Sequence, residues 1–285
     1  NLELQPGDVV TIFGVKDVPV PIAKRTHFVS LGGEVRVPGI YQVQPSDTLP
    51  DLVKRAGGFT PNAYVYGTTL TRESTRRSQQ ANLDEAIDRV QAQSEAMVAS
   101  LLQNQSPNGA DASSAQALLA SQRQSLARMR TIKSTGRIAL EMNANRPELP
   151  PISLEDGDNI TVPVRPSFVG VFGSVLAKTS FIWRQGDTVQ DYINRAGATR
   201  DADLEAALII RADGTVIANN AQRSFMGFGN QGFMNTELNS GDSVFVPEIL
   251  DKRNAYTRFI QGAKDWTALL YQFGLGAAGF KSLGY

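Results

Sequence analysis

The sequence contains the same stretch of chain twice. Residues 31–57 align without a gap with residues 171–197, and both copies share a glycine, an Asp-Thr pair and an Arg-Ala-Gly ending in the same order. The repeat-defining residues are Gly33, Asp47, Arg55 and Gly57 in the first copy and Gly173, Asp187, Arg195 and Gly197 in the second. An ordered, ungapped repeat predicts two copies of one structural unit.

A shorter element occurs three times, at residues 4–12, 154–163 and 238–247. Each copy has Leu, two variable residues, Gly-Asp and then alternating apolar residues. A Gly-Asp turn before such alternation indicates a strand, and the proline after the last two copies ends it. The second and third copies therefore close the two repeat units. The first copy is expected to close a preceding, truncated domain, so residues 1–27 are predicted to be a closing strand and linker.

Each repeat unit is predicted to contain two strands, a short helix, a hairpin and the closing strand. Asp47-Thr48 and Asp187-Thr188 are helix-capping signals, and an apolar face and an Ala-Gly ending follow them in both copies. One helix on a small mixed sheet is typical of a β-grasp unit. The predicted fold class is α+β, with tandem β-grasp domains at residues 28–163 and 164–250.

The first unit carries an insertion that the second lacks. In the second unit Asp213-Gly214 joins two apolar strands directly, which is a strong hairpin signal. In the first unit residues 74–134 separate the matching strands, and their apolar spacing predicts a helical hairpin with helices at roughly 74–103 and 113–134. Two interpretations remain open, a partner-contact arm and a surface decoration.

Residues 251–285 are predicted to form an amphipathic helix that is long enough to cross a bilayer. Several copies in a ring would place apolar side chains against lipid and polar ones towards water. The lipid-facing candidates are Trp266, Leu269, Leu270, Tyr271 and Phe273, and the lumen-facing candidates are Gln261, Lys264, Asp265 and Gln272. The alternative is a helix docked on the β-grasp domains.

Composition excludes several chemistries. The chain has no cysteine, a single histidine (His27) and a net charge of zero, so we expect no thiolate metal site, no metal or cofactor, and no nucleic-acid partner. The acidic groups Asp201/Asp203 and 155–158 lie beside turns, where capping explains them better than catalysis. Two Gly-x-Gly-x-x-Gly segments, 227–232 and 274–279, lack the strand and helix context of a dinucleotide site. They are interpreted as a flexible loop and as small-residue helix packing.

The whole pattern resembles the bacterial outer-membrane polysaccharide export family with tandem SLBB (soluble-ligand-binding β-grasp) domains. The residues that carry the resemblance are 33–41, 47–49, 55–60 and the Gly-Asp strands, whereas the second copy lacks the Pro-Gly turn. The resemblance implies a homo-oligomeric ring in the outer membrane and periplasm that passes a polysaccharide passenger outward and works with an inner-membrane copolymerase. The lipidated cysteine and export-signature domain of the family are missing, which agrees with a truncated amino terminus.

Three hypotheses follow. The first is a subunit of an outer-membrane and periplasmic channel, a non-enzymatic conduit for capsular polysaccharide or exopolysaccharide. The alternative is a periplasmic saccharide-binding module without a channel of its own. The third is an enzyme, for which no convergent nucleophile, base or metal set is found, so catalytic residues are expected to be none.

Overall fold

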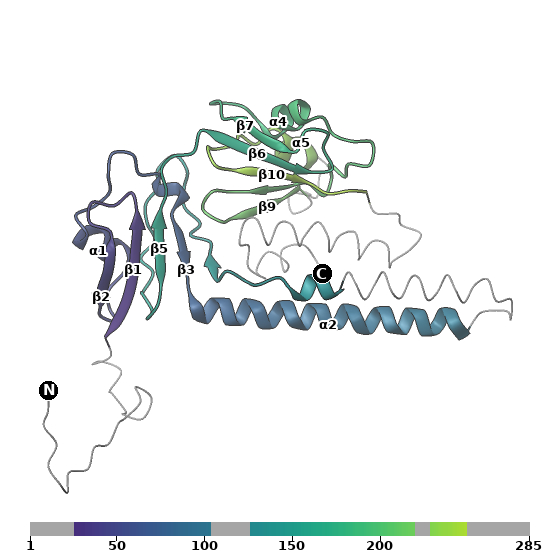
Figure 1. Ribbon diagram of the computed structural model, residues 1–285. Coiled ribbons are helices and arrows are strands. Elements are labelled where there is room, and N and C mark those ends of the chain that lie inside the picture. The colour runs from purple at the N-terminus through teal and green to yellow at the C-terminus, as the bar shows by residue number, and fades with distance from the viewer. Residues whose placement is uncertain (1–25, 104–125, 220–228, 250–285) are drawn as a thin grey trace, which may run out of the picture.

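The computed structural model describes residues 26–103, 126–219 and 229–249, which form two five-stranded sheets (Figure 1). The first sheet, ordered β2-β1-β5-β3-β4, contains β1 (His27–Gly33), β2 (Gly39–Val43), β3 (Thr69–Thr71), β4 (Arg137–Ile138) and β5 (Asn159–Val162). The second sheet, ordered β7-β6-β10-β8-β9, contains β6 (Phe168–Gly173), β7 (Thr179–Ile182), β8 (Leu208–Ile210), β9 (Val216–Ala218) and β10 (Ser243–Val246).

The two sheets have the same topology. In each one the closing strand, β5 or β10, pairs parallel with the first strand of the unit and antiparallel with the third. The remaining pairs are antiparallel in both sheets. This mixed α+β arrangement is consistent with tandem β-grasp-like domains, as the internal repeat predicted.

One short helix follows the first hairpin of each unit. These are α1 (Leu49–Arg55) and α4 (Val189–Ala196), and both begin with a capping box. The Thr48 amide donates to the Asp51 carboxylate at 3.2 Å, and the Thr188 amide donates to the Asp191 carboxylate at 2.9 Å. Each carboxylate satisfies an amide that the helix itself cannot reach, so the same sequence signal starts the helix at the same place in both domains.

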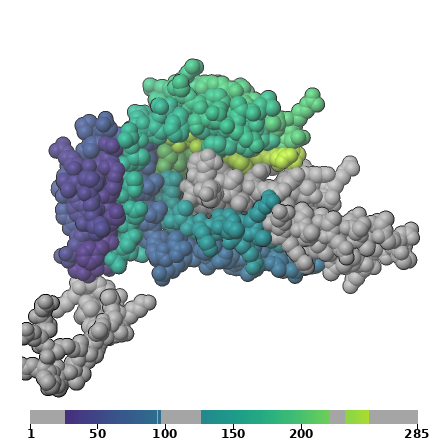
Figure 2. Space-filling view, viewed as in Figure 1, coloured from purple at the N-terminus to yellow at the C-terminus, as the bar shows by residue number. Residues whose placement is uncertain are grey.

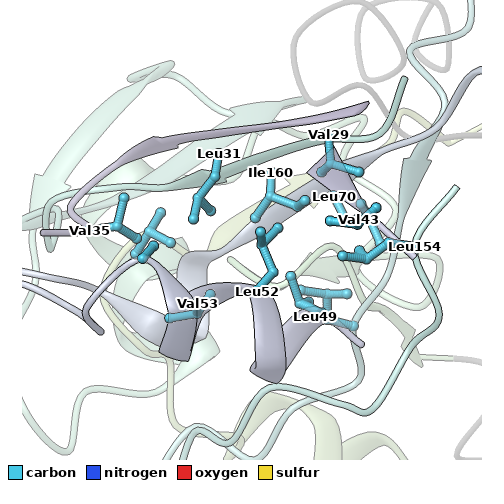
Figure 3. Close-up of a cluster of buried hydrophobic side chains, with 13 residues drawn as sticks. Val29, Leu31, Val35, Val43, Leu49, Leu52, Val53, Leu70, Leu154 and Ile160 are labelled. Carbon is cyan, nitrogen blue, oxygen red and sulfur yellow. The ribbon is translucent and has the colours of Figure 1, made fainter. Parts of the chain in front are cut away.

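Each helix packs on one face of its sheet and builds the domain core there. In the first domain, Leu49, Leu52 and Val53 of α1 lie below the strand residues Leu31 and Ile160, and all five are buried (Figure 3). In the second domain the corresponding cluster contains Tyr192 and Ile193 of α4 with residues of β6, β8 and β10. The strand residues that belong to these two clusters alternate along the strands, because successive side chains point to opposite faces.

The second sheet is also buried on its other face. A separate cluster joins its outward-pointing residues to α2 (Glu73–Gln103), the long helix of the insertion, and to residues 126–132. Its buried members are Leu83, Ile87, Val90, Leu126, Ile132, Leu208, Ile210, Ala218 and Phe245. Figure 1 shows α2 leaving the first sheet at β3 and running below the second domain, and Figure 2 shows the same placement in space-filling form. Neither interpretation of the insertion predicted this packing within the chain.

The expected second helix of the insertion is described only in part. Residues 126–130 are helical, whereas residues 104–125 lie outside the described residues. The predicted strand at residues 4–12 and the predicted tail helix at 251–285 also lie outside them. The domain boundaries remain predictions, although β1 to β5 fall within residues 27–162 and β6 to β10 within residues 168–246.

The segment interpreted as a flexible loop is helical where the structure describes it. Helix α5 (Gly229–Met234) begins inside the Gly-x-Gly-x-x-Gly stretch. Phe233 is fully buried in the core cluster of the second domain, so burial of this ring accounts for the ordered turn of helix.

Candidate functional site

The membrane-facing and lumen-facing candidates all belong to the predicted tail segment, residues 251–285. Trp266, Leu269, Leu270, Tyr271 and Phe273 lie outside the described residues, as do Gln261, Lys264, Asp265 and Gln272. Among the described residues, no helix combines the length and apolar character needed to span a bilayer.

The repeat-defining acidic and basic residues form one ion pair in each domain. Arg55 contacts Asp47 with 3.2 Å between the guanidinium nitrogen and the carboxylate oxygen, and Arg195 pairs with Asp187 in the same way. Each pair ties the end of the helix to the loop before it. The arginines also lie over the rings of Tyr41 and Tyr192, at 6.0 and 4.7 Å from the ring centroids. The pairs are partly exposed, so their contribution to stability is small.

The repeat-defining glycines occupy positions that a side chain would not tolerate. Gly33 and Gly173 have φ of 80° and 91°, and a Cβ on either would overlap the carbonyl oxygen of the neighbouring closing strand. Gly57 and Gly197, which end the helices, also have positive φ values. These four glycines therefore have structural roles, because only glycine adopts this backbone conformation without cost.

A second, more buried ion pair recurs in both domains and was missed in the sequence. Asp158, the aspartate of the Gly-Asp element, accepts hydrogen bonds from Arg72 at 2.7 and 2.9 Å, and its side chain is fully buried. Asp242 occupies the same place in the second domain and accepts from Arg211 at 2.6 Å. Both arginines directly follow the third strand of their unit, so extending the repeat alignment to these strands would have found the pair.

The carboxylates that could have suggested acid–base chemistry have structural partners. Asp156 accepts from the Phe28 amide at 2.8 Å, and Asp203 accepts from two backbone amides at 3.1 Å. Glu155 accepts from Arg72 at 2.9 Å. Among the described residues, no group of three or more His, Asp or Glu side chains has the arrangement of a metal site. His27 lies 3.3 Å from the Leu154 carbonyl oxygen, at the start of β1.

The region between the two sheets is held by polar contacts around the Asp213-Gly214 turn. The Asp213 carboxylate accepts from the Met142 amide at 3.0 Å, and its backbone oxygen accepts from the Leu140 amide at 3.3 Å. Arg137 of β4 donates to the Ala212 carbonyl oxygen at 2.6 Å, and burial lowers the pKa of this guanidinium. Residues that follow the insertion thus fix the hairpin turn of the second domain.

An aromatic cluster lies at the other side of this junction. Arg165, in the linker between β5 and β6, has its guanidinium carbon 5.8 Å from the ring centroid of Tyr64 and 5.1 Å from that of Trp183. The Tyr64 hydroxyl donates to the Ser240 carbonyl oxygen at 2.5 Å, which joins the two domains. Burial raises the pKa of the Tyr64 phenol, so this hydroxyl stays protonated at neutral pH and remains a donor. Sequence analysis missed this cluster because its members come from three separate segments.

Comparison with known protein families finds a match in the first repeat unit. Residues 28–79 match the SLBB domain family. That range runs from β1 to the first turns of α2, so it contains the first repeat unit up to the insertion. The second unit has the same sheet topology.

Two curated relatives make the comparison more specific. Both are named "Polysialic acid transport protein KpsD" of Escherichia coli, and each is 28% identical to this chain over 159 residues. The matched region covers 55% of this chain and 25% of each relative, so the chain matches about a quarter of their length. Together, the SLBB match and these relatives support the resemblance to polysaccharide export proteins with an SLBB domain.

Proposed function

We propose that this chain is a subunit of a channel that exports capsular polysaccharide or exopolysaccharide through the periplasm and outer membrane. The observation that carries the proposal is the SLBB match at residues 28–79 together with similarity to a polysialic acid transport protein. The role is transport without covalent chemistry. The Asp and Glu residues discussed above support this, because they serve caps and ion pairs.

The arrangement of the two domains supports a scaffold in the proposed channel. Two copies of one sheet topology are joined through a short linker, and the insertion packs on the second of them. A homo-oligomeric ring would align these copies around a common axis, with the tail at residues 251–285 as its membrane segment. The inner-membrane copolymerase would supply the polymer to the periplasmic end.

A genetic experiment tests the export role. Deleting the gene in its source bacterium should leave polymer in the periplasm and lower the amount at the cell surface, and the full-length gene should restore it. Periplasmic and surface polymer are measured separately with a polymer-specific antibody or lectin. Unchanged surface polymer in the deletion strain would contradict the proposal.

The alternative function is a periplasmic saccharide-binding module without its own channel. It is favoured by the SLBB match alone, which covers the first repeat unit only as far as the start of the insertion. Mass photometry of the full-length protein in detergent separates the two functions. A closed ring of many subunits supports the channel, whereas a monomer with saccharide affinity supports the binding module.

A further inference from the structure

The guanidinium of Arg165 differs from those of the other arginines that lie over aromatic rings. Arg55 and Arg195 each contact a tyrosine ring and also pair with an aspartate. Arg165 contacts two rings and is exposed, and within the described part of the chain it forms no ion pair. Its charge is therefore held in a fixed place without a neutralising carboxylate from the described residues.

The two rings that hold Arg165 are themselves fixed. The indole nitrogen of Trp183 donates to the Leu238 carbonyl oxygen at 2.7 Å, and Trp183 packs against the core of the second domain. The Tyr64 hydroxyl donates to the Ser240 carbonyl oxygen, as described above. A cation held over two fixed rings loses little conformational freedom when it binds an anion, which favours affinity.

Comparison of the two repeat units shows that this cluster is specific to the junction. The amide of Tyr64 donates to the carbonyl oxygen of the proline that ends β5, and the amide of Asp203 does the same at the proline that ends β10. Asp203 is thus the equivalent of Tyr64. Two residues after the same prolines, the first unit has Arg165 and the second has Ile249.

The third member of the cluster also departs from the repeat. Trp183 directly follows β7, and its equivalent in the first unit is Val43, the last residue of β2, which is buried in the first core. A large ring with its polar atom directed to a loop has replaced a small core residue. The three departures come from three separate segments and meet at one point.

From this geometry we propose that Arg165, Tyr64 and Trp183 form a binding site for a carboxylate group of an acidic polysaccharide. The guanidinium of Arg165 would donate two parallel hydrogen bonds to one carboxylate, as its planar fork allows. The parts of Tyr64 and Trp183 that the guanidinium leaves uncovered would border the sugar ring. This inference rests on the proposed export function, since it names the charge of the passenger.

A fluorescence titration tests the site in the full-length chain. The chain has two tryptophans, so Trp266→Phe leaves Trp183 as the only indole, and its emission reports on the Arg165 environment. The probes are a sialic acid hexamer, maltohexaose as the neutral saccharide, and polyglutamate as an acidic polymer without sugar. We expect a saturable change with the sialic acid hexamer and dissociation constants at least about tenfold higher for the other two.

Matched arginine variants distinguish binding at this site from general attraction between opposite charges. Arg165→Gln should raise the dissociation constant for the sialic acid hexamer roughly tenfold or more, and Arg165→Lys, which keeps the charge but loses the fork, should give a smaller rise. Arg200→Gln removes an exposed arginine outside the cluster and should change the constant less than about twofold. The inference is overturned if Arg165→Gln and Arg200→Gln have equal effects, or if maltohexaose binds as tightly as the acidic hexamer.

Two further measurements distinguish failure of this inference from failure of the proposed function. Mass photometry of the chain with Trp266 unchanged reports assembly, because Trp266 is itself a lipid-facing candidate, and thermal melting of the titrated samples reports folding. A ring that gives no Trp183 response refutes the carboxylate site and leaves the channel proposal intact. A folded monomer that binds the sialic acid hexamer through Arg165 supports the site and contradicts the channel.

Discussion

The two domains share a sheet topology but differ in what lies on the outer face of the sheet. In the first domain this face carries Thr69 and Thr71 of β3 and Thr161 of β5, which are exposed or half-buried. The equivalent positions of the second domain, from the strand pairings, are Leu208, Ile210 and Phe245, and all are buried. The fold of the sheet thus does not decide whether its second face is apolar.

The difference follows from the insertion. The first domain supplies α2 and residues 126–132, and these pack in the cluster on the outer face of the second sheet. The inner faces of both sheets are alike, because each receives a short helix of its own domain. Duplication therefore explains the inner face, whereas the outer face reflects contact between the two copies.

Removing the insertion should have the largest effect on the difference between the two sheets. Replacing residues 74–134 by a two-residue Asn-Gly turn restores a plain β3–β4 hairpin but leaves the apolar outer face of the second sheet without its cover. We expect amide hydrogen exchange in β8 and β10 to accelerate on the order of a hundredfold or more, and exchange in β1 and β5 to change little.

A matched control asks whether the apolar face causes this effect. In the deletion variant, changing Leu208, Ile210 and Phe245 to threonine copies the surface of the first sheet. The control should show less aggregation than the deletion alone, because its exposed face is polar. If the deletion accelerated exchange in β5 and β10 by the same factor, the role assigned to the insertion would be contradicted.

Single substitutions at equivalent positions should show the same contrast on a smaller scale. Phe245→Ala removes a buried ring and should destabilise the protein by about 3–5 kcal/mol. Thr161→Ala, at the equivalent position of the first sheet, changes an exposed side chain and should stay within about 0.5 kcal/mol. Urea unfolding followed by circular dichroism measures both, and similar losses for the two variants would refute the comparison.

Substitutions in the capping boxes should have the smallest effect, and the two domains should respond to them alike. Hydrogen bonds from the Thr48 side chain and amide lower the pKa of Asp51, and hydrogen bonds from the Thr188 amide and side chain lower that of Asp191. A lowered folded-state pKa stabilises the protein above the unfolded pKa of about 4, and this stabilisation is lost as the pH falls through the folded value.

Asp51→Asn and Asp191→Asn should therefore each lower Tm by about 2 °C or less at pH 7. Both losses should shrink as the pH is lowered below the ordinary aspartate pKa. Differential scanning fluorimetry over this pH range measures the effect, with Asp201→Asn as a control outside the capping boxes. A clear difference between Asp51→Asn and Asp191→Asn would show that the two caps are not equivalent.

Much of the fold was predictable because the decisive signals are local. The Asp-Thr caps, the Ala-Gly helix ends and the Asp213-Gly214 turn each act within a few residues, and the structure has helices and a hairpin at these places. The internal repeat then extended these local predictions from one domain to the other. The same alignment could also have predicted the Arg72–Asp158 pair, since an arginine directly follows the matching strand in both units.

The contacts between the domains were harder to predict because they join distant segments. Residues 207–210 are all apolar, whereas residues 68–71 are Thr-Thr-Leu-Thr. This difference indicates that the second sheet is covered on both faces. It does not indicate which segment covers it. The meeting of Tyr64, Arg165 and Trp183 likewise depends on the angle between the domains, which no local pattern encodes.

The position of α2 in the chain also bears on the order of folding during synthesis. The ribosome makes proteins from the amino terminus, and domains generally fold in that order. Helix α2 precedes every strand of the second sheet. The surface that will receive Leu208 and Phe245 is therefore already made when these residues emerge, which shortens the time for which their apolar side chains face solvent. A circular permutant that places the insertion last would lose this temporal protection.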